Sequence, residues 1–274
     1  MNTLLKSFFV WLVILIVPCW ASSNVGVVNG LTHERIASAG QVYETIIIIK
    51  NFGELPSRVK VYQTDFHFYS DGRQIHSEAG KLERSNAGWI SYYPKSVVLS
   101  PGESAELKCT VQTPEDDTFC GTYWSVLMVE PVLEVQAEVK QEQKSQVSYG
   151  ITQVLRYAVQ IITHIGDSGT RRINFLDTQL LREEEKNILQ VDVENTGERW
   201  LRPVLYVELY NEKGDHIGRF EGGKWRIYPG TSVRYRVDLS TIAEGTYKAM
   251  IIVDNLDEYV FGAEYSLNIH PVFP

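Results

Sequence analysis

The sequence predicts an all-β protein built from two tandem immunoglobulin-like β-sandwich domains. The first observation behind this prediction is that three short words occur twice, in the same order, in the two halves of the chain. The pairs are NFGE (51–54) and NTGE (195–198), PGES (101–104) and PGTS (229–232), and GTYWSVLMVE (121–130) and GTYKAMIIVD (245–254). Asn, Gly and Pro favour turns, and each GTY word opens a run typical of a strand. Repeated words in a fixed order indicate one supersecondary unit that is used twice.

The second observation is the density of strand patterns in the first half. YETIIIIKN (43–51) and SRVKVYQTDFHFYS (57–70) are rich in β-branched and aromatic residues and are bounded by Gly and Pro. The alternation slips near Gln63, which indicates a bulge or a change of sheet. WISYYP, SVVLSPGES, AELKCTV and GTYWSVLMVE follow at short intervals. Several short strands separated by turns favour a sandwich or a barrel.

The first domain closes with one long strand. Residues 134–148 read EVQAEVKQEQKSQVS and predict either a short amphipathic helix or a solvated loop. Residues 150–166 read GITQVLRYAVQIITHIG, in which apolar residues alternate along one face and a mixed set fills the other. We therefore expect an N-terminal domain over 23–166.

The second half repeats the same organisation. GDSGTRR (166–172) is small and polar, and it is the candidate hinge between the domains. The strand-like runs beyond it are INFLDTQLL, KNILQVDVEN, RPVLYVELYN, HIGRF, SVRYRVDL, GTYKAMIIVDN and YVFGAEYSLNI. LQVDVE and VLYVELY alternate as half-buried antiparallel strands do. We expect the C-terminal domain over 167–274.

The N-terminus predicts a signal peptide over 1–22. Lys6 precedes the apolar run FFVWLVILIV (8–17), and Pro18 and small residues follow it. The apolar run is shorter than the roughly 20 residues that span a membrane, so we expect no stable span once the signal is cleaved. A lipidated Cys19 and an uncleaved anchor are the weaker alternatives.

Composition and the cysteines indicate which class of partner is disfavoured and whether a disulfide is expected. The chain is 44% hydrophobic and 22% charged with a net charge of -8, which disfavours nucleic-acid binding. After signal cleavage two cysteines remain, Cys109 and Cys120, on either side of TVQTPEDDTF. In an oxidising compartment they are expected to form a structural disulfide. Their spacing differs from the C-x-x-C of a redox pair.

The sequence contains no motif that indicates an enzyme or a cofactor. His-Glu-x-x-His, G-x-S-x-G and a Gly-rich loop between strand and helix are all absent from it. Asp65, His67, Asp71 and His76 form the nearest approach to a metal cluster. Such residues are more often the wet face of a strand next to a turn, so no metal is predicted.

Four tryptophans raise the question of carbohydrate stacking. Trp89, Trp124, Trp200 and Trp225 lie on or beside strand-like runs, where core packing is the commoner role. Sugar binding therefore ranks below binding of a protein partner.

Four stretches together resemble the periplasmic pilus-assembly chaperones of the PapD-like family. They are GLTHERIASAG (30–40), SVVLSPGESAELKCTV (96–111), GTYWSVLMVEPV (121–132), and the polar segment 134–148 followed by ITQVLRYAVQIITHI (151–165). The likeness covers nearly the whole chain after the signal. It implies two immunoglobulin-like domains arranged as a boomerang, a periplasmic location, and subunits of pili or other surface fibres as protein partners.

The resemblance also implies site residues. The family holds the subunit's terminal carboxylate with an Arg and a Lys, for which Arg35 corresponds to the Arg. Residues 150–166 contain no Lys, and Arg156 and Gln160 are the nearest polar residues there. An Arg binds a carboxylate in a bidentate manner.

In the same family a long edge strand is lent to the subunit. The side chains expected to enter the subunit are Leu155, Tyr157, Val159 and Ile161, on one face of the long strand. The alternative is that this face completes the core of the first domain.

The functional prediction is a periplasmic chaperone-like protein that binds surface-fibre subunits by strand donation. The alternative of a different class is an adhesion or scaffold module of a cell-surface complex. A domain of a secreted enzyme is a third and weaker possibility, and cell-surface or lipid-anchored placement is the weaker location.

Overall fold

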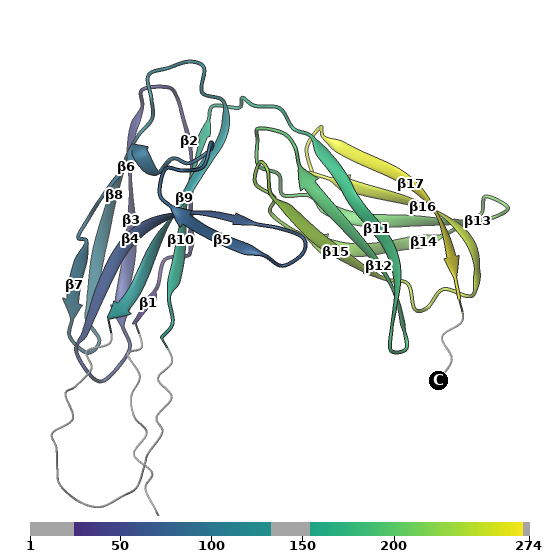
Figure 1. The fold of residues 1–274 in the computed structure, drawn as a ribbon, viewed down its shortest axis with the longest axis horizontal. Coiled ribbons are helices and arrows are strands. Elements are labelled where there is room, and N and C mark those ends of the chain that lie inside the picture. Colours follow the sequence, from purple (N-terminus) through teal and green to yellow (C-terminus); the bar gives the residue numbers. More distant parts are fainter. Residues whose placement is uncertain (1–24, 133–153, 271–274) are drawn as a thin grey trace, which may run out of the picture.

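The computed structural model describes residues 25–132 and 154–270. The predicted signal peptide with Cys19, and the polar segment 134–148, lie outside the described residues. Within them, strands dominate and one three-residue helical turn is present. Figure 1 shows two β-sandwiches that meet at an angle, which is the boomerang shape that the sequence motifs imply.

The first sandwich has eleven elements and the second has seven. Those of the N-terminal domain are β1 (Val25–Val27), β2 (Thr32–Ala37), β3 (Val42–Asn51), β4 (Ser57–Phe68), β5 (Gln74–Glu78), the 3-10 turn η1 (Ala87–Trp89), β6 (Ile90–Tyr93), β7 (Ser96–Leu99), β8 (Ser104–Gln112), β9 (Gly121–Val132) and β10 (Tyr157–Ile165). Those of the C-terminal domain are β11 (Ile173–Glu183), β12 (Lys186–Asn195), β13 (Val204–Asn211), β14 (His216–Lys224), β15 (Ser232–Asp238), β16 (Gly245–Asp254) and β17 (Val260–Ile269).

Two sheets enclose the core of the N-terminal domain. One has the order β1-β3-β8-β6, and the other has the order β2-β10-β9-β4-β5 with β7 also paired to β4. The consecutive strands β1 and β2 join opposite sheets, β1 antiparallel to β3 and β2 parallel to β10. Alternate residues of both sheets meet in the core, among them Ile47, Leu107, Leu127 and Val159.

The C-terminal domain repeats this plan with fewer strands. Its sheets have the orders β11-β12-β15 and β14-β13-β16-β17, and all the pairings are antiparallel. Leu189 and Tyr235 from the first sheet pack against Val207 and Ile251 from the second, all fully buried. The predicted pair of immunoglobulin-like sandwiches is therefore confirmed.

The repeated words occupy equivalent structural positions. In each domain the Asn of the N-x-G-E word is buried, and its carbonyl accepts a hydrogen bond from the Gly of the PGxS word. The Gly102 N to Asn51 O distance is 2.9 Å and the Gly230 N to Asn195 O distance is 2.8 Å. Both glycines have a positive φ, 75° and 71°, which a side chain would make costly. The two sequence motifs are repeated because the same pair of turns is hydrogen-bonded in each sandwich.

The segment between the domains is held by hydrogen bonds rather than left free. The buried Arg199 donates to the carbonyl of Gly166 over 2.6 Å, and the N–H of Glu198 donates to the carbonyl of Thr170 over 2.8 Å. The hairpin β4–β5 reaches the second domain, where Ser70 N donates to Ser232 Oγ (Figure 1). These contacts connect the candidate hinge at 166–172 and the β4–β5 hairpin to the second domain.

The predicted disulfide is wrong, because both thiols are free. Cys109 lies on β8 with its side chain in the core of the first sandwich, where burial raises its pKa to about 12. Cys120 precedes β9 at the domain junction and donates its thiol to Glu198 Oε1 of the second domain over 3.4 Å. The side chains belong to two different environments, a core and a domain junction, which sequence spacing does not distinguish.

Candidate functional site: the edge of β10 and the interdomain pocket

β10 has one neighbour along its whole length and a second neighbour along only part of it. It pairs with β9 from Tyr157 to Ile165, but β2 covers its other edge only from Gln160 onward. Gln160 N donates to Leu31 O on that side over 2.9 Å. Since alternate residues of a strand face the same neighbour, the N–H and C=O of Ala158 point to the uncovered edge. No strand of the described chain pairs with them there.

The four apolar residues predicted to enter a subunit have different surroundings. Val159 and Ile161 are 0% and 1% exposed and belong to the core of the first sandwich. Tyr157 is partly buried and packs against that core. Leu155, just before the strand begins, is 53% exposed. The deeper half of this face thus completes the core, whereas Leu155 at the start of the strand is exposed.

An exposed aromatic ring lies beside the uncovered edge. A Cβ on Gly26 of β1 would lie 3.0 Å from the Phe52 ring and 3.4 Å from the Tyr157 hydroxyl, so these three residues are in close contact. Phe52 and the nearby Leu55 are both more than half exposed. An unpaired strand edge next to exposed apolar side chains invites another chain to pair with it.

The two predicted arginines are not brought together. Arg35 pairs in register with Thr163, and it lines a pocket of about 280 Å³ at the open side between the two sheets. Arg156 is located near the other end of β10, with its Nε 3.5 Å from Glu130 Oε1. At about 3.3 Å per residue, roughly 23 Å of strand separates the two positions. Arg35 and Arg156 therefore cannot hold one carboxylate between them.

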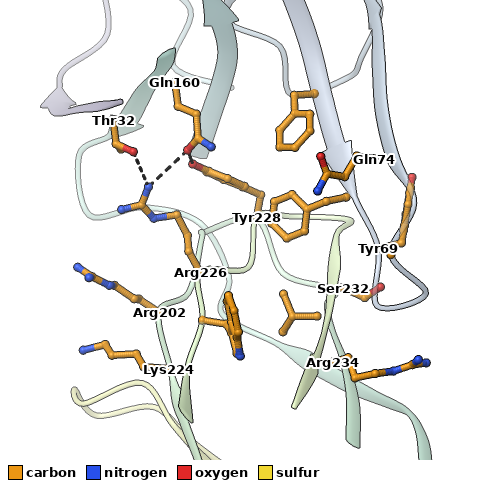
Figure 2. A pocket seen from close by; sticks show the side chains of 15 residues that line it. Thr32, Tyr69, Gln74, Gln160, Arg202, Lys224, Arg226, Tyr228, Ser232 and Arg234 are labelled. Carbon is orange, nitrogen blue, oxygen red and sulfur yellow. Dashed lines mark hydrogen bonds between the residues drawn. The ribbon is translucent and has the colours of Figure 1, made fainter. Parts of the chain in front are cut away.

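A larger pocket lies between the domains. Its volume is about 510 Å³. The first domain contributes Thr32 of β2, Gln160 of β10 and the β4–β5 hairpin (Figure 2). We call it the interdomain pocket and define it by its lining residues, Thr32, Phe66, Phe68, Tyr69, Gly72, Gln74, Gln160, Arg202, Lys224, Trp225, Arg226, Tyr228, Ser232, Val233 and Arg234.

Arg226 connects the two domains across this pocket. Its Nη1 donates to Thr32 Oγ1 over 3.2 Å and to Gln160 Oε1 over 3.4 Å, as the dashed lines in Figure 2 show. The Tyr228 hydroxyl donates to the same Gln160 oxygen over 2.5 Å, and burial raises the pKa of Tyr228 to about 12. The Arg226 guanidinium also lies over the Trp200 ring, 4.3 Å from its centroid.

The composition of this pocket was only partly accessible from the sequence. Gln160, which the sequence offers as one of the nearest polar residues on 150–166 in place of the family Lys, lines the interdomain pocket. Arg226 was missed, because it lies in the other domain and only the packing of the domains brings it to β10. The one signal in the sequence is that KWR (224–226) combines two cations with an aromatic residue.

The residues considered for a metal site do not converge. The buried carboxylate of Asp65 accepts two backbone N–H groups and a serine hydroxyl, and His67 stacks on Trp124. Asp71 pairs with a neighbouring arginine, and His76 contacts a threonine hydroxyl across the hairpin. Within 25–132 and 154–270, no three or more His, Cys, Asp or Glu residues are grouped so that they could hold a metal ion.

The tryptophans mostly pack against other rings. Trp89 contacts Tyr123, and Trp124 and Trp200 belong to the domain junction. Trp225 is more than half exposed and lines the interdomain pocket.

No helix in the described part of the chain is long and apolar enough to cross a membrane.

Neither a family model nor a curated protein matches the chain. Solved structures do match. The class 5 fimbriae chaperone CfaA is 13% identical, with 90% of this chain and 100% of that chain covered and a TM-score of 0.45. The E. coli chaperone DraB is 13% identical, with 89% and 99% covered and a TM-score of 0.41.

A third match is a chain of the CsuC–CsuE chaperone–tip adhesion subunit complex of archaic Csu pili from Acinetobacter baumannii. It is 14% identical, with 80% of this chain and 94% of that chain covered and a TM-score of 0.41. These three matches are to structures of fimbrial or pilus chaperones, alone or in complex, which is the family that the sequence motifs resemble.

Proposed function

We propose that this protein is a periplasmic chaperone-like protein that binds subunits of a pilus, fimbria or other surface fibre by lending them β10. The observation that carries the proposal is the uncovered edge of β10 before Gln160, with the backbone groups of Ala158 directed outward. An incomplete partner domain gains main-chain hydrogen bonds from such an edge, and its apolar groove gains the adjacent side chains. The class of partner comes from the sequence motifs at 30–40 and 121–132.

In this proposal β10 belongs to its own domain and also pairs with the partner, because different residues of the strand make the two sets of contacts. Val159 and Ile161 anchor β10 in the core of its own domain. This anchoring keeps the strand extended, so little conformational entropy is lost when a partner pairs with it. Leu155 and Tyr157, on the same face but nearer the uncovered edge, would enter the partner's groove together with the exposed ring of Phe52.

The other parts of the proposal follow from the sequence. Export with cleavage of residues 1–22 would place the protein in the periplasm, where fibre subunits pass before assembly. No cofactor, metal or catalytic step is part of the proposed activity.

The test is to remove one outward N–H from the edge. Ala158→Pro deletes that donor without deleting a hydrogen bond to β9, and Pro is tolerated on strand edges. Ala158→Val is the matched control, because it enlarges the same side chain and keeps the N–H. Each tagged variant is expressed in its native host, and co-purifying proteins are identified by mass spectrometry.

We expect the parent and Ala158→Val to retain small exported β-rich subunits in a one-to-one complex and Ala158→Pro to lose them. Hydrogen exchange of the complex should show protection at 155–159 relative to the free protein. Equal capture by all three folded variants would overturn strand donation and favour the adhesion or scaffold module, which would not depend on this edge.

A further inference from the structure

We propose that the interdomain pocket binds the acidic side chains of a peptide segment, with Arg226 as the principal ligand and Arg202 and Lys224 completing a cationic wall. The pocket lining includes four cations and no Asp or Glu. Arg234, the fourth cation, already has a partner, since its Nη2 lies 2.7 Å from Asp192 Oδ2. Arg202, Lys224 and Arg226 form no ion pair with any residue of the described chain.

Three unpaired cations on one wall are unexpected in this protein. The chain has 34 acidic and 26 basic residues, so carboxylates are the more abundant charge. Figure 2 shows the side chains of Arg202, Lys224 and Arg226 extending in the same direction, with Arg234 on the opposite side. Like charges held close together repel one another, and a bound anion removes that repulsion.

Neighbouring groups hold the Arg226 guanidinium in place, but its hydrogen-bond donors are only partly used. Trp200 supports its flat face, and the acceptors that it reaches, Thr32 and Gln160, are neutral. Its Nε is buried without a hydrogen-bond partner. A fixed guanidinium that still has free donors is suited to a carboxylate, which accepts two parallel hydrogen bonds from it.

A peptide is favoured as the source of the carboxylates because the pocket continues the uncovered edge of β10. A chain paired along 155–159 must leave the edge at Gln160, where the Leu31 carbonyl occupies the next donor. Gln160 and Thr32 both line the pocket at that point. A volume of about 510 Å³ holds more than one side chain, which agrees with a wall of several cations. The identity of this peptide as part of a bound subunit rests on the proposed function, whereas the affinity of the pocket for acidic side chains does not.

The test uses full-length mature protein and synthetic peptides in isothermal titration calorimetry at low ionic strength. The acidic probe is acetyl-Gly-Ser-Asp-Glu-Asp-Gly-amide, which has side-chain carboxylates only. Its two counterparts are the Asn-Gln-Asn amide and the Asn-Gln-Asn peptide with a free carboxyl terminus. Oligogalacturonate is the third comparison, as an acidic ligand that is not a peptide.

The variants are Arg226→Gln, Arg226→Lys and the exposed Arg202→Gln, with Arg219→Gln as a control cation outside the pocket. We expect the acidic amide to bind, Arg226→Gln and Arg202→Gln each to weaken binding at least tenfold, and Arg226→Lys to recover only part of it. Arg219→Gln and Ala158→Pro should bind the acidic amide as the parent does.

Binding of the free-terminus peptide alone, of oligogalacturonate alone, or of none of the probes would overturn the proposal. Equal loss in Arg219→Gln would also overturn it, because the effect would then be one of net charge. Since Ala158→Pro affects only the edge and Arg202→Gln only the pocket, failure of this inference and failure of strand donation give different results.

Discussion

Alanine substitution of either buried turn asparagine should cost the protein a large part of its stability. Asn195 is 0% exposed. Its Nδ2 donates to the carbonyls of Arg199 and Ile227 over 2.8 and 3.0 Å, and its Oδ1 accepts from Gly197 N over 2.9 Å. At a net value of about 1 kcal/mol for each hydrogen bond, Asn195→Ala should lower the free energy of unfolding by about 3 kcal/mol.

The repeat supplies an internal replicate of this experiment. Asn51 is also 0% exposed, donates to Leu55 O and Leu99 O over 2.8 and 3.0 Å, and accepts from Gly53 N over 2.9 Å. Because the two turns have the same geometry, Asn51→Ala should cost the first domain about as much, ~3 kcal/mol. Urea denaturation followed by tryptophan fluorescence measures both variants.

A third asparagine separates burial from the number of hydrogen bonds. Asn211 makes three hydrogen bonds within an exposed turn, to Lys213 N, Asp215 N and Asp215 Oδ2, each 2.9 Å long. Water can replace these bonds, so Asn211→Ala should cost less than about 1 kcal/mol. The reasoning is refuted if Asn51→Ala and Asn195→Ala cost no more than Asn211→Ala.

Two further predictions concern the domain junction. Burial first, and then Arg199 and Arg226, lower the pKa of His164 to about 3 despite a contact with Glu34. The unfolded state therefore binds more protons than the folded state between pH 6.5 and pH 3. The free energy of unfolding should fall by about 2 kcal/mol from pH 7 to pH 5. Denaturation measured across this pH range should show a smaller fall for His164→Gln. Gly121→Ala should separate the domains, because its Cβ would lie 2.2 Å from a backbone oxygen, whereas Gly102→Ala, at a similar positive φ with open space around it, should only lose stability. Small-angle X-ray scattering should show an increased radius of gyration for Gly121→Ala alone.

The fold was predictable because the signals that define it are local. Alternation with a period of two identified the strands, and Asn-x-Gly-Glu and Pro-Gly-x-Ser identified the turns that each domain uses. The long strand after the polar segment was also visible, since Leu155, Tyr157, Val159 and Ile161 alternate in the sequence. Alternation shows that these residues share a face, but not where along the strand that face stops being covered.

The site was less predictable because it depends on contacts between distant segments. Arg35 shares a face with Thr163, not with Gln160, and this follows from the parallel register of β2 on β10. Arg226 reaches β10 only through the packing of the second domain. Cys109 and Cys120 are near in sequence, yet Cys109 lies in the core of the first domain and Cys120 lies at the domain junction. Register and domain packing are long-range properties that no short motif records.

The packing of the domain junction places the uncovered edge of β10 next to the interdomain pocket, since β2 covers β10 from Gln160 onward and Gln160 lines the pocket. Trp124 and Tyr228 stack in parallel with centroids 4.7 Å apart, and His164 stacks on Trp200 from the opposite domain. These contacts hold Arg226 in place relative to Gln160 before any partner arrives. On the proposed function, a partner that pairs with 155–159 would meet a cationic wall that is already in place without domain closure. Preorganisation of this kind lowers the entropy lost on binding, and in such a complex it would make the spacing between the paired strand and the acidic segment a criterion of specificity.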